Sequence, residues 1–135
     1  MILKLINLNI WLGGRDTYNN LMNFLETEKP DILTLQEVLA GEGPELDNYL
    51  RSFEKIKEAT GLSGIFEPAV LMQFNGKTVP TGNAILSKFP LKKSTLFGCM
   101  GNKQLSNRLK SQLTNSMAET CSIVKQIYME LHTTL

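Results

Sequence analysis

The pattern of apolar and polar residues divides the beginning of the chain into three elements. Residues 2–11 alternate apolar side chains with a lysine and two asparagines, which predicts a strand buried mainly on one face. Residues 17–28 place apolar side chains three or four positions apart, as one face of a helix requires. Residues 31–38 carry an apolar run, made of Ile32, Leu33, Leu35 and Val38, that also holds Gln36 and Glu37 near its end; such an apolar run is typical of a strand covered on both faces. The pattern therefore predicts a strand, a helix and a second strand in succession.

Such a unit can place its two strands side by side, with both carboxyl ends at one edge of the sheet. Asn9 lies near the end of the first predicted strand, and Glu37 lies near the end of the second. A buried strand is a rigid support for a single acidic side chain. We therefore expect Asn9 and Glu37 to lie within a few ångströms of each other, and Glu37 is the leading candidate for a functional residue.

A second helix is expected at residues 44–60. Pro44 suits the first turn of a helix, and Gly61 suits its end. Its apolar residues would form one buried face.

A β-hairpin is expected next. Residues 65–74 are apolar and aromatic, and the Asn-Gly pair that follows them favours a hairpin turn. The returning strand is expected to be interrupted at residues 80–82 and to resume at 83–87. A glycine inside a strand, here Gly82, indicates that another backbone or a ligand approaches closely.

The end of the chain has a different pattern. Residues 102–131 contain neither glycine nor proline, and their apolar side chains recur in steps of three or four. This predicts one long helix, or two helices with a break near residues 114–117. Two interpretations stay open: the apolar stripe covers part of the sheet, or it binds a partner chain.

Composition limits what this chain can be. At 135 residues and 42% hydrophobic content, the chain is long enough for one globular core. A net charge of +1 gives no general attraction to nucleic acids or anionic membranes. Cys99 and Cys121 lack metal-ligand or redox spacing, so we interpret them as reduced thiols of a cytoplasmic protein. Neither a signal peptide nor a membrane-spanning stretch is recognised.

Three motifs together resemble a known family. They are Leu8-Asn9-Ile10-Trp11, residues 31–38 (DILTLQEV) and residues 82–90 (GNAILSKFP). In this order and spacing they are similar to the first three motifs of the endonuclease/exonuclease/phosphatase family, also called deoxyribonuclease-like. The resemblance implies an α/β (α+β) fold, namely a two-sheet β-sandwich flanked by helices, of which residues 1–92 would form the N-terminal half. It also implies a divalent-metal phosphoesterase of the kind that acts on nucleic acids, phosphoinositides or sphingolipids.

The resemblance assigns roles to three residues. Glu37 would be the principal metal ligand, and Asn9 would lie beside it and orient the waters of the metal or the phosphate. Asn83 would be a neighbour of the substrate. Mg²⁺, or Mn²⁺, is the expected cofactor, weakly bound, because Mg²⁺ takes oxygen ligands and is commonly held by only one or two carboxylates. The substrate would be a phosphate ester whose class stays open, nucleic acid included.

The chain departs from the family after its third motif. The family supplies further catalytic groups from an Asp-x-Asn motif and a closing Asp-His pair. Here the last of three aspartates is Asp47, and the single histidine, His132, follows a leucine, so we interpret His132 as a surface residue.

We therefore expect a truncated endonuclease/exonuclease/phosphatase-like domain at residues 1–92, followed by a helical tail at residues 93–135 that does not match the family. The expected function is that of a magnesium-dependent phosphoesterase, inactive or weak as this chain. The alternative is a non-catalytic fragment or interaction module, in which residues 102–131 bind a partner chain.

Overall fold

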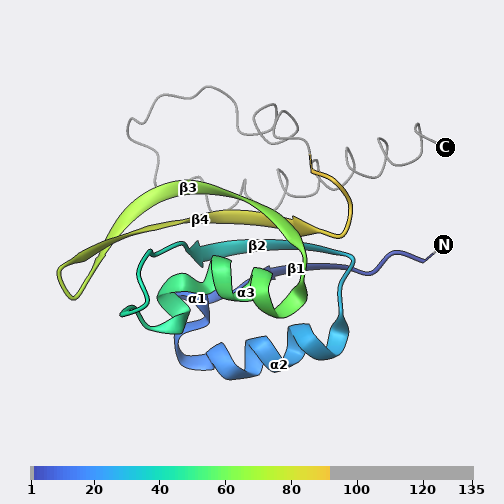
Figure 1. Ribbon diagram of the computed structural model, residues 1–135, viewed down its shortest axis with the longest axis horizontal. Helices are drawn as coiled ribbons and strands as arrows, with labels where there is room; N and C mark the ends of the chain where they lie inside the picture. The colour runs from blue at the N-terminus through green and yellow to red at the C-terminus, as the bar shows by residue number, and fades with distance from the viewer. Residues whose placement is uncertain (1, 92–135) are drawn as a thin grey trace. The chain divides into compact units, whose positions relative to one another are not determined.

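Four strands form a mixed sheet in the computed structural model, which describes residues 2–91 (Figure 1). The order across the sheet is β1-β2-β4-β3. The first two strands are parallel, and the other two pairs are antiparallel. The bounds are Leu5–Asn9 for β1, Ile32–Leu39 for β2, Ser63–Phe74 for β3 and Lys77–Ser87 for β4.

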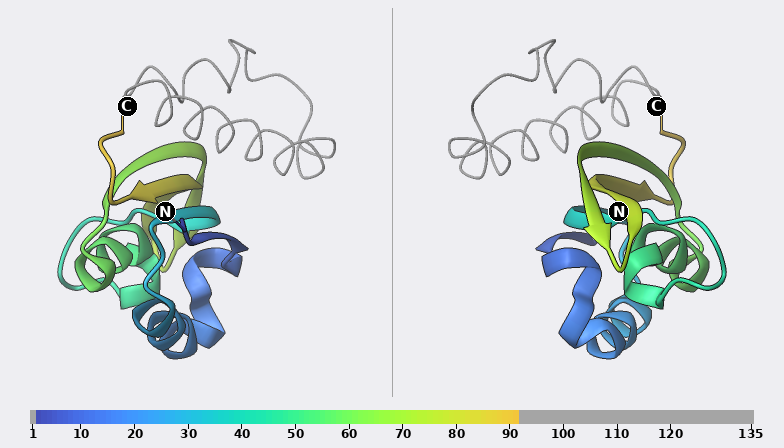
Figure 2. Two further views of the ribbon diagram at one scale, coloured as in Figure 1. Left: turned by 90° about the vertical axis from the view of Figure 1, so that its right-hand side faces the viewer. Right: turned by 90° about the vertical axis from the view of Figure 1, so that its left-hand side faces the viewer.

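The helical elements gather on one side of this sheet (Figures 1 and 2). Two are regular helices and one, α1, is a single turn; short 3-10 turns precede both regular helices. The bounds are Trp11–Gly14 for α1, Arg15–Thr17 for η1, Tyr18–Glu28 for α2, Asn48–Arg51 for η2 and Ser52–Thr60 for α3.

Burial of apolar side chains between the sheet and the helices explains this arrangement. The core joins Leu33 and Leu35 of β2 to Leu21 and Leu25 of α2 and Ile56 of α3. Each of these residues is less than one tenth exposed. Fully burying such a side chain contributes about 1.5–3 kcal/mol, so the helices are held on this face. The described residues thus form a mixed α/β unit, which agrees with the predicted class.

The predicted strand-helix-strand unit is confirmed. Strand β1 runs parallel to β2, with Asn9 paired to Gln36 at the carboxyl end of the ladder. Both strand ends therefore lie at one edge of the sheet.

The predicted start of the second helix is wrong. The α-helix begins at Ser52 instead of Pro44. Gly43 has a φ of +109°, and its carbonyl accepts a turn hydrogen bond from the Leu46 N–H. The Leu50 carbonyl accepts from Gly41. These loop hydrogen bonds occupy backbone groups that a longer helix would need.

The predicted interruption at residues 80–82 is also wrong, because β4 runs without a break from Lys77 to Ser87. Pro80 lies one residue beyond the last β2 pair, which joins Leu39 to Thr81. Its carbonyl still accepts from the Ala40 N–H over 3.0 Å. Because the ladder to β2 ends there, the missing N–H of Pro80 removes no hydrogen bond from it.

The close approach expected at Gly82 is confirmed, and the neighbour is backbone. A Cβ at this position would lie 2.0 Å from the Glu67 carbonyl oxygen. Strand β3 bulges beside this contact, between Pro68 and Val70.

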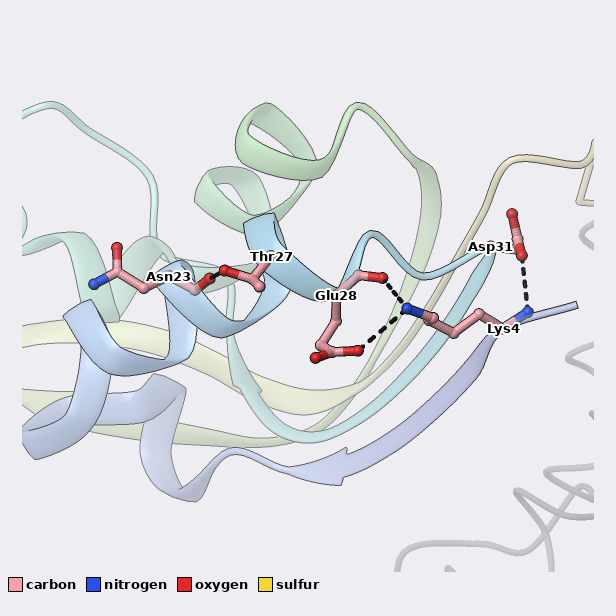
Figure 3. A network of polar contacts seen from close by, with 5 residues as sticks. All are labelled: Lys4, Asn23, Thr27, Glu28 and Asp31. Carbon is pink, nitrogen blue, oxygen red and sulfur yellow. Dashed lines mark hydrogen bonds and ion pairs between the residues drawn. The ribbon is translucent and has the colours of Figure 1, made fainter.

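Polar contacts hold the end of the sheet where β1 and β2 begin and β4 ends (Figure 3). The Lys4 backbone N–H donates to Asp31 Oδ2 over 2.8 Å, and Lys4 Nζ donates to the Glu28 carbonyl over 2.7 Å. Lys88 Nζ lies 2.5 Å from Asp31 Oδ1. Asp31 therefore joins the chain before β1 to the chain after β4.

Several predictions fall outside the described residues. The tail at residues 93–135, the apolar stripe at 102–131, the two cysteines and His132 are among them. The residues that are described form one sheet, so the second sheet of the sandwich and the helical tail both stay predictions.

Candidate functional site

A β-bulge sets the direction of Glu37. Leu35 pairs with Ala84 and Val38 pairs with Gly82, so two residues of β2, Gln36 and Glu37, face the single residue between them on β4. Strict alternation would send Glu37 to the helix-covered face together with Leu35. The extra residue of the bulge sends Val38 there instead. Glu37 is left free to meet polar groups on the opposite face.

Asn9 is the polar group that Glu37 meets. Asn9 Nδ2 donates to Glu37 Oε1 over 3.0 Å, as the strand pairing predicted. Asn9 is exposed and Glu37 is half-buried. The backbone of Glu37 has a φ of +57°, in the left-handed region that L-residues seldom occupy. Such strain persists only where the surrounding structure imposes it, and it concentrates at functional sites.

The turn after β1 supplies two further donors to the same pair. The Trp11 N–H donates to Asn9 Oδ1 over 2.9 Å, and the Leu12 N–H donates to Glu37 Oε2 over 3.2 Å. The four residues of α1 all have positive φ, from +46° to +81°. This left-handed turn directs its first two amides toward the side chains of the site.

Gly13 makes the left-handed turn feasible. Its φ is +71°, and a Cβ there would lie 2.1 Å from the Tyr49 carbonyl oxygen. The turn is further held by Leu12, whose side chain packs against the cluster of Leu39, Leu50 and Val79.

The third predicted site residue, Asn83, is the residue of β4 that faces the bulge. It also pairs with Glu67 of β3 and is half-buried. Its place in the strand register brings it opposite Gln36 and Glu37. Its role as a neighbour of the substrate stays a prediction.

A polar group that sequence reasoning missed lies beside the site. Asn7 Oδ1 accepts two hydrogen bonds of 2.8 Å, one from Thr34 Oγ1 and one from Gln36 Nε2. Thr34 and Gln36 are buried at 1% and 8% exposure. These bonds fix the Asn7 amide with its N–H groups directed away from Thr34 and Gln36. The sequence did contain a signal for Asn7. Asn7 lies two positions before Asn9, and residues two apart share one face of a strand.

The donor set fits one hard divalent cation. A carboxylate has about four acceptor positions, and hydrogen bonds from Asn9 and Leu12 use one on each oxygen of Glu37. Acceptor positions therefore remain on both oxygens. Among residues 2–91 no group of three or more acidic, histidine or cysteine side chains gathers in one place. A cation held here would depend on one carboxylate, with water or substrate completing its shell.

A pocket of about 380 Å³ lies elsewhere, between the loop at residues 40–44 and the start of α3. Its lining includes neither Asn9 nor Glu37. The cation in its wall, Arg51, forms an ion pair with Glu54. The pocket is therefore separate from the carboxylate site.

The described residues thus form a mixed α/β domain in which an amide and a carboxylate meet at the carboxyl edge of two parallel strands. The sequence profile of the Endonuclease/Exonuclease/phosphatase family matches residues 6–118, and the chain belongs to that family. The match continues past residue 92, and the boundary between domain and tail stays a prediction. Comparison with curated proteins and with solved structures gives no significant match. Within residues 2–91, no helix is both long and apolar enough to cross a membrane.

Proposed function

We propose that this chain carries the metal-binding part of a magnesium- or manganese-dependent phosphoesterase site, with Glu37 as the metal ligand. The observation that carries the proposal is the hydrogen bond from Asn9 to Glu37. It is supported by the strained bulge that turns Glu37 away from the core. Membership of the Endonuclease/Exonuclease/phosphatase family is the second support.

Each residue of the candidate site has a separate proposed role. Glu37 offers carboxylate oxygens to the cation, and a bound Mg²⁺ would stabilise negative charge on a phosphate ester. Asn9 holds Glu37 with one amide hydrogen and has a second one to donate to a phosphate oxygen. Because Asn9 is neutral, it adds no charge that repels the phosphate. Asn83, opposite the bulge, is proposed to contact the substrate.

We propose that hydrolysis by this chain is slow. General acid–base catalysis contributes about 10²–10⁴ in rate, and the Asp-x-Asn and Asp-His motifs implied by the family do not occur in the sequence. The substrate is proposed to be a phosphate ester, with nucleic acids among the candidates.

The primary experiment measures Mn²⁺ or Mg²⁺ binding to the full chain by calorimetry. The parent should bind weakly, and Glu37→Gln should abolish the binding while keeping the shape of the side chain. Glu26→Gln, an exposed glutamate on α2, is the matched control and should bind as the parent does. Equal binding by the parent and Glu37→Gln would remove Glu37 as the ligand.

A hydrolysis assay with a simple phosphodiester and with DNA complements the binding measurement. We expect turnover far below that typical of the Endonuclease/Exonuclease/phosphatase family. Rapid, metal-dependent turnover that Glu37→Ala abolishes would show that other residues of the chain supply the missing catalytic groups. In that event the proposal of slow hydrolysis is wrong and the assignment of Glu37 stands.

A second proposal concerns a partner chain. The apolar stripe at residues 102–131 supports a non-catalytic role as an interaction module. This stripe lies outside the described residues. Sedimentation of the purified chain over a range of concentrations tests the simplest case, in which the partner is a second copy.

A further inference from the structure

Trp11 combines two unfavourable features beside the candidate site. Its side chain is 66% exposed, although an indole is largely apolar. Its φ is +51°, which is a true outlier for a bulky residue. The positive φ costs conformational energy, and the exposed ring contributes little burial to offset it. An outlier of this kind points to a functional role for the position.

The backbone of Trp11 is held by a hydrogen bond, whereas its side chain is largely exposed. Its N–H donates to Asn9 Oδ1, and the next N–H in the chain donates to Glu37. Trp11 belongs to neither of the two apolar clusters formed by the described residues. The turn thus places the backbone of Trp11 at the edge of the sheet where Asn9 and Glu37 meet.

We propose that the Trp11 indole stacks on the aromatic base of a nucleotide whose phosphate lies at the Asn9–Glu37 pair. The inference rests on the proposed function, because it needs a phosphate at that pair. An exposed aromatic face stacks on any base and needs no hydrogen-bond readout. Trp11 is therefore assigned as the residue that favours a nucleotide over a phosphate ester that lacks an aromatic base.

The distribution of apolar side chains favours a base over a lipid surface. Membrane association requires a contiguous apolar face or a basic helix. Among residues 2–91, the other large exposed apolar side chains are Ile2 and Leu5, before and at the start of β1, Phe24 on α2, and Val70 and Leu71 on β3. Strand β3 is three strand spacings, about 14 Å, from β1. A single exposed ring, that of Trp11, is better suited to stacking on a base than to binding a lipid surface.

The experiment uses the fluorescence of Trp11, which is the single tryptophan of the chain. The full chain is titrated with AMP and with ribose 5-phosphate, which lacks the base, with and without Mg²⁺. Excitation at the red edge of the indole band avoids absorption by AMP. We expect AMP to quench the fluorescence and ribose 5-phosphate to leave it unchanged.

Calorimetry on variants tests the energetic contribution of the ring. Trp11→Ala should weaken AMP binding about tenfold and leave ribose 5-phosphate binding unchanged. Trp11→Phe should retain most of the affinity for AMP. Phe24→Ala removes an exposed aromatic side chain from α2 and should behave as the parent does.

Three results would overturn the inference. The first is equal affinity of the parent for AMP and ribose 5-phosphate, and the second is absence of AMP binding. The third is a blue shift of the Trp11 fluorescence on addition of anionic phospholipid vesicles, when AMP leaves that fluorescence unchanged. Failure of the proposed function is distinguishable from these results. If Glu37→Gln binds Mn²⁺ as the parent does while AMP still quenches Trp11, the metal assignment fails and the base-stacking role stands.

Discussion

Asn9 Nδ2 lies 3.0 Å from Glu37 Oε1, so two side chains separated by 28 positions in the sequence form one polar unit. Each is also bound by an amide of the turn that follows β1. The unit is therefore held from two directions before any ligand arrives. Preorganisation of this kind is what a weak, single-carboxylate metal site needs.

The first prediction concerns Asn9. Asn9→Ala should weaken Mn²⁺ binding about tenfold or more, because side chains that orient a metal ligand are commonly worth 10–100-fold in affinity. Calorimetry on the full chain measures the change. Asn20→Ala, an exposed asparagine of α2, is the control. Unchanged affinity in Asn9→Ala would show that Glu37 needs no orientation by its neighbour.

The second prediction concerns backbone strain at Glu37. Glu37→Gly should be more stable than Glu37→Ala by roughly 1 kcal/mol, because glycine adopts positive φ without steric cost. Urea unfolding followed by circular dichroism measures the difference. At Ala84, whose φ is not positive, the change from alanine to glycine should instead destabilise the protein. The same sign at both positions would contradict the strain at the bulge.

The third prediction compares two buried threonines. Thr81 Oγ1 has no hydrogen-bond partner among residues 2–91, whereas Thr34 Oγ1 donates to Asn7. Thr81→Val should raise the free energy of unfolding by about 1 kcal/mol, because it removes an unpaired buried hydroxyl. Thr34→Val should lower it by about 1 kcal/mol, because it breaks a buried hydrogen bond. Destabilisation in both variants would indicate that Thr81 has a partner.

The fourth prediction concerns the stability of the protein at low pH. The hydrogen bond from the Lys4 backbone N–H, followed by that from Lys88, holds the pKa of Asp31 below its ordinary value of 3.8. A carboxyl whose pKa is lowered by folding stabilises the protein above its unfolded pKa, and this contribution is lost as the pH falls through the folded pKa. Asp31→Asn should therefore be less stable than the parent at neutral pH.

The gap between the parent and Asp31→Asn should narrow as the pH falls below about 4. Urea midpoints measured across this range test the narrowing, with the exposed Asp16→Asn as the control for loss of one carboxylate. A gap that stays constant with pH would show that the contacts of Asp31 with Lys4 and Lys88 do not depend on its charge.

Much of the architecture was predictable because it depends on local periodicity. A two-residue period in residues 2–11 and a helical period in residues 17–28 identified β1 and α2. The parallel pairing of β1 with β2 followed from the order of the elements. That pairing brings Asn9 and Glu37 to the same edge of the sheet.

Other features were not predictable because they depend on residues distant in the sequence. Pro80 continues β4 because β2 has already ended beside it. The second helix starts late because loop partners take its early backbone groups. The side chain of Asn7, beside the site, is fixed only by its contacts with Thr34 and Gln36 of the next strand.

The sequence by itself determined which residues are candidates for the site, since a carboxylate and an amide near two strand ends are fixed by the order of residues along the chain. The tertiary structure decided how they are aimed. Alternation along β2 would have turned Glu37 into the core, and only the bulge opposite β4 turns it toward Asn9. A bulge arises from the pairing of two strands, so its place is set by the register of the sheet and cannot be deduced from one strand alone.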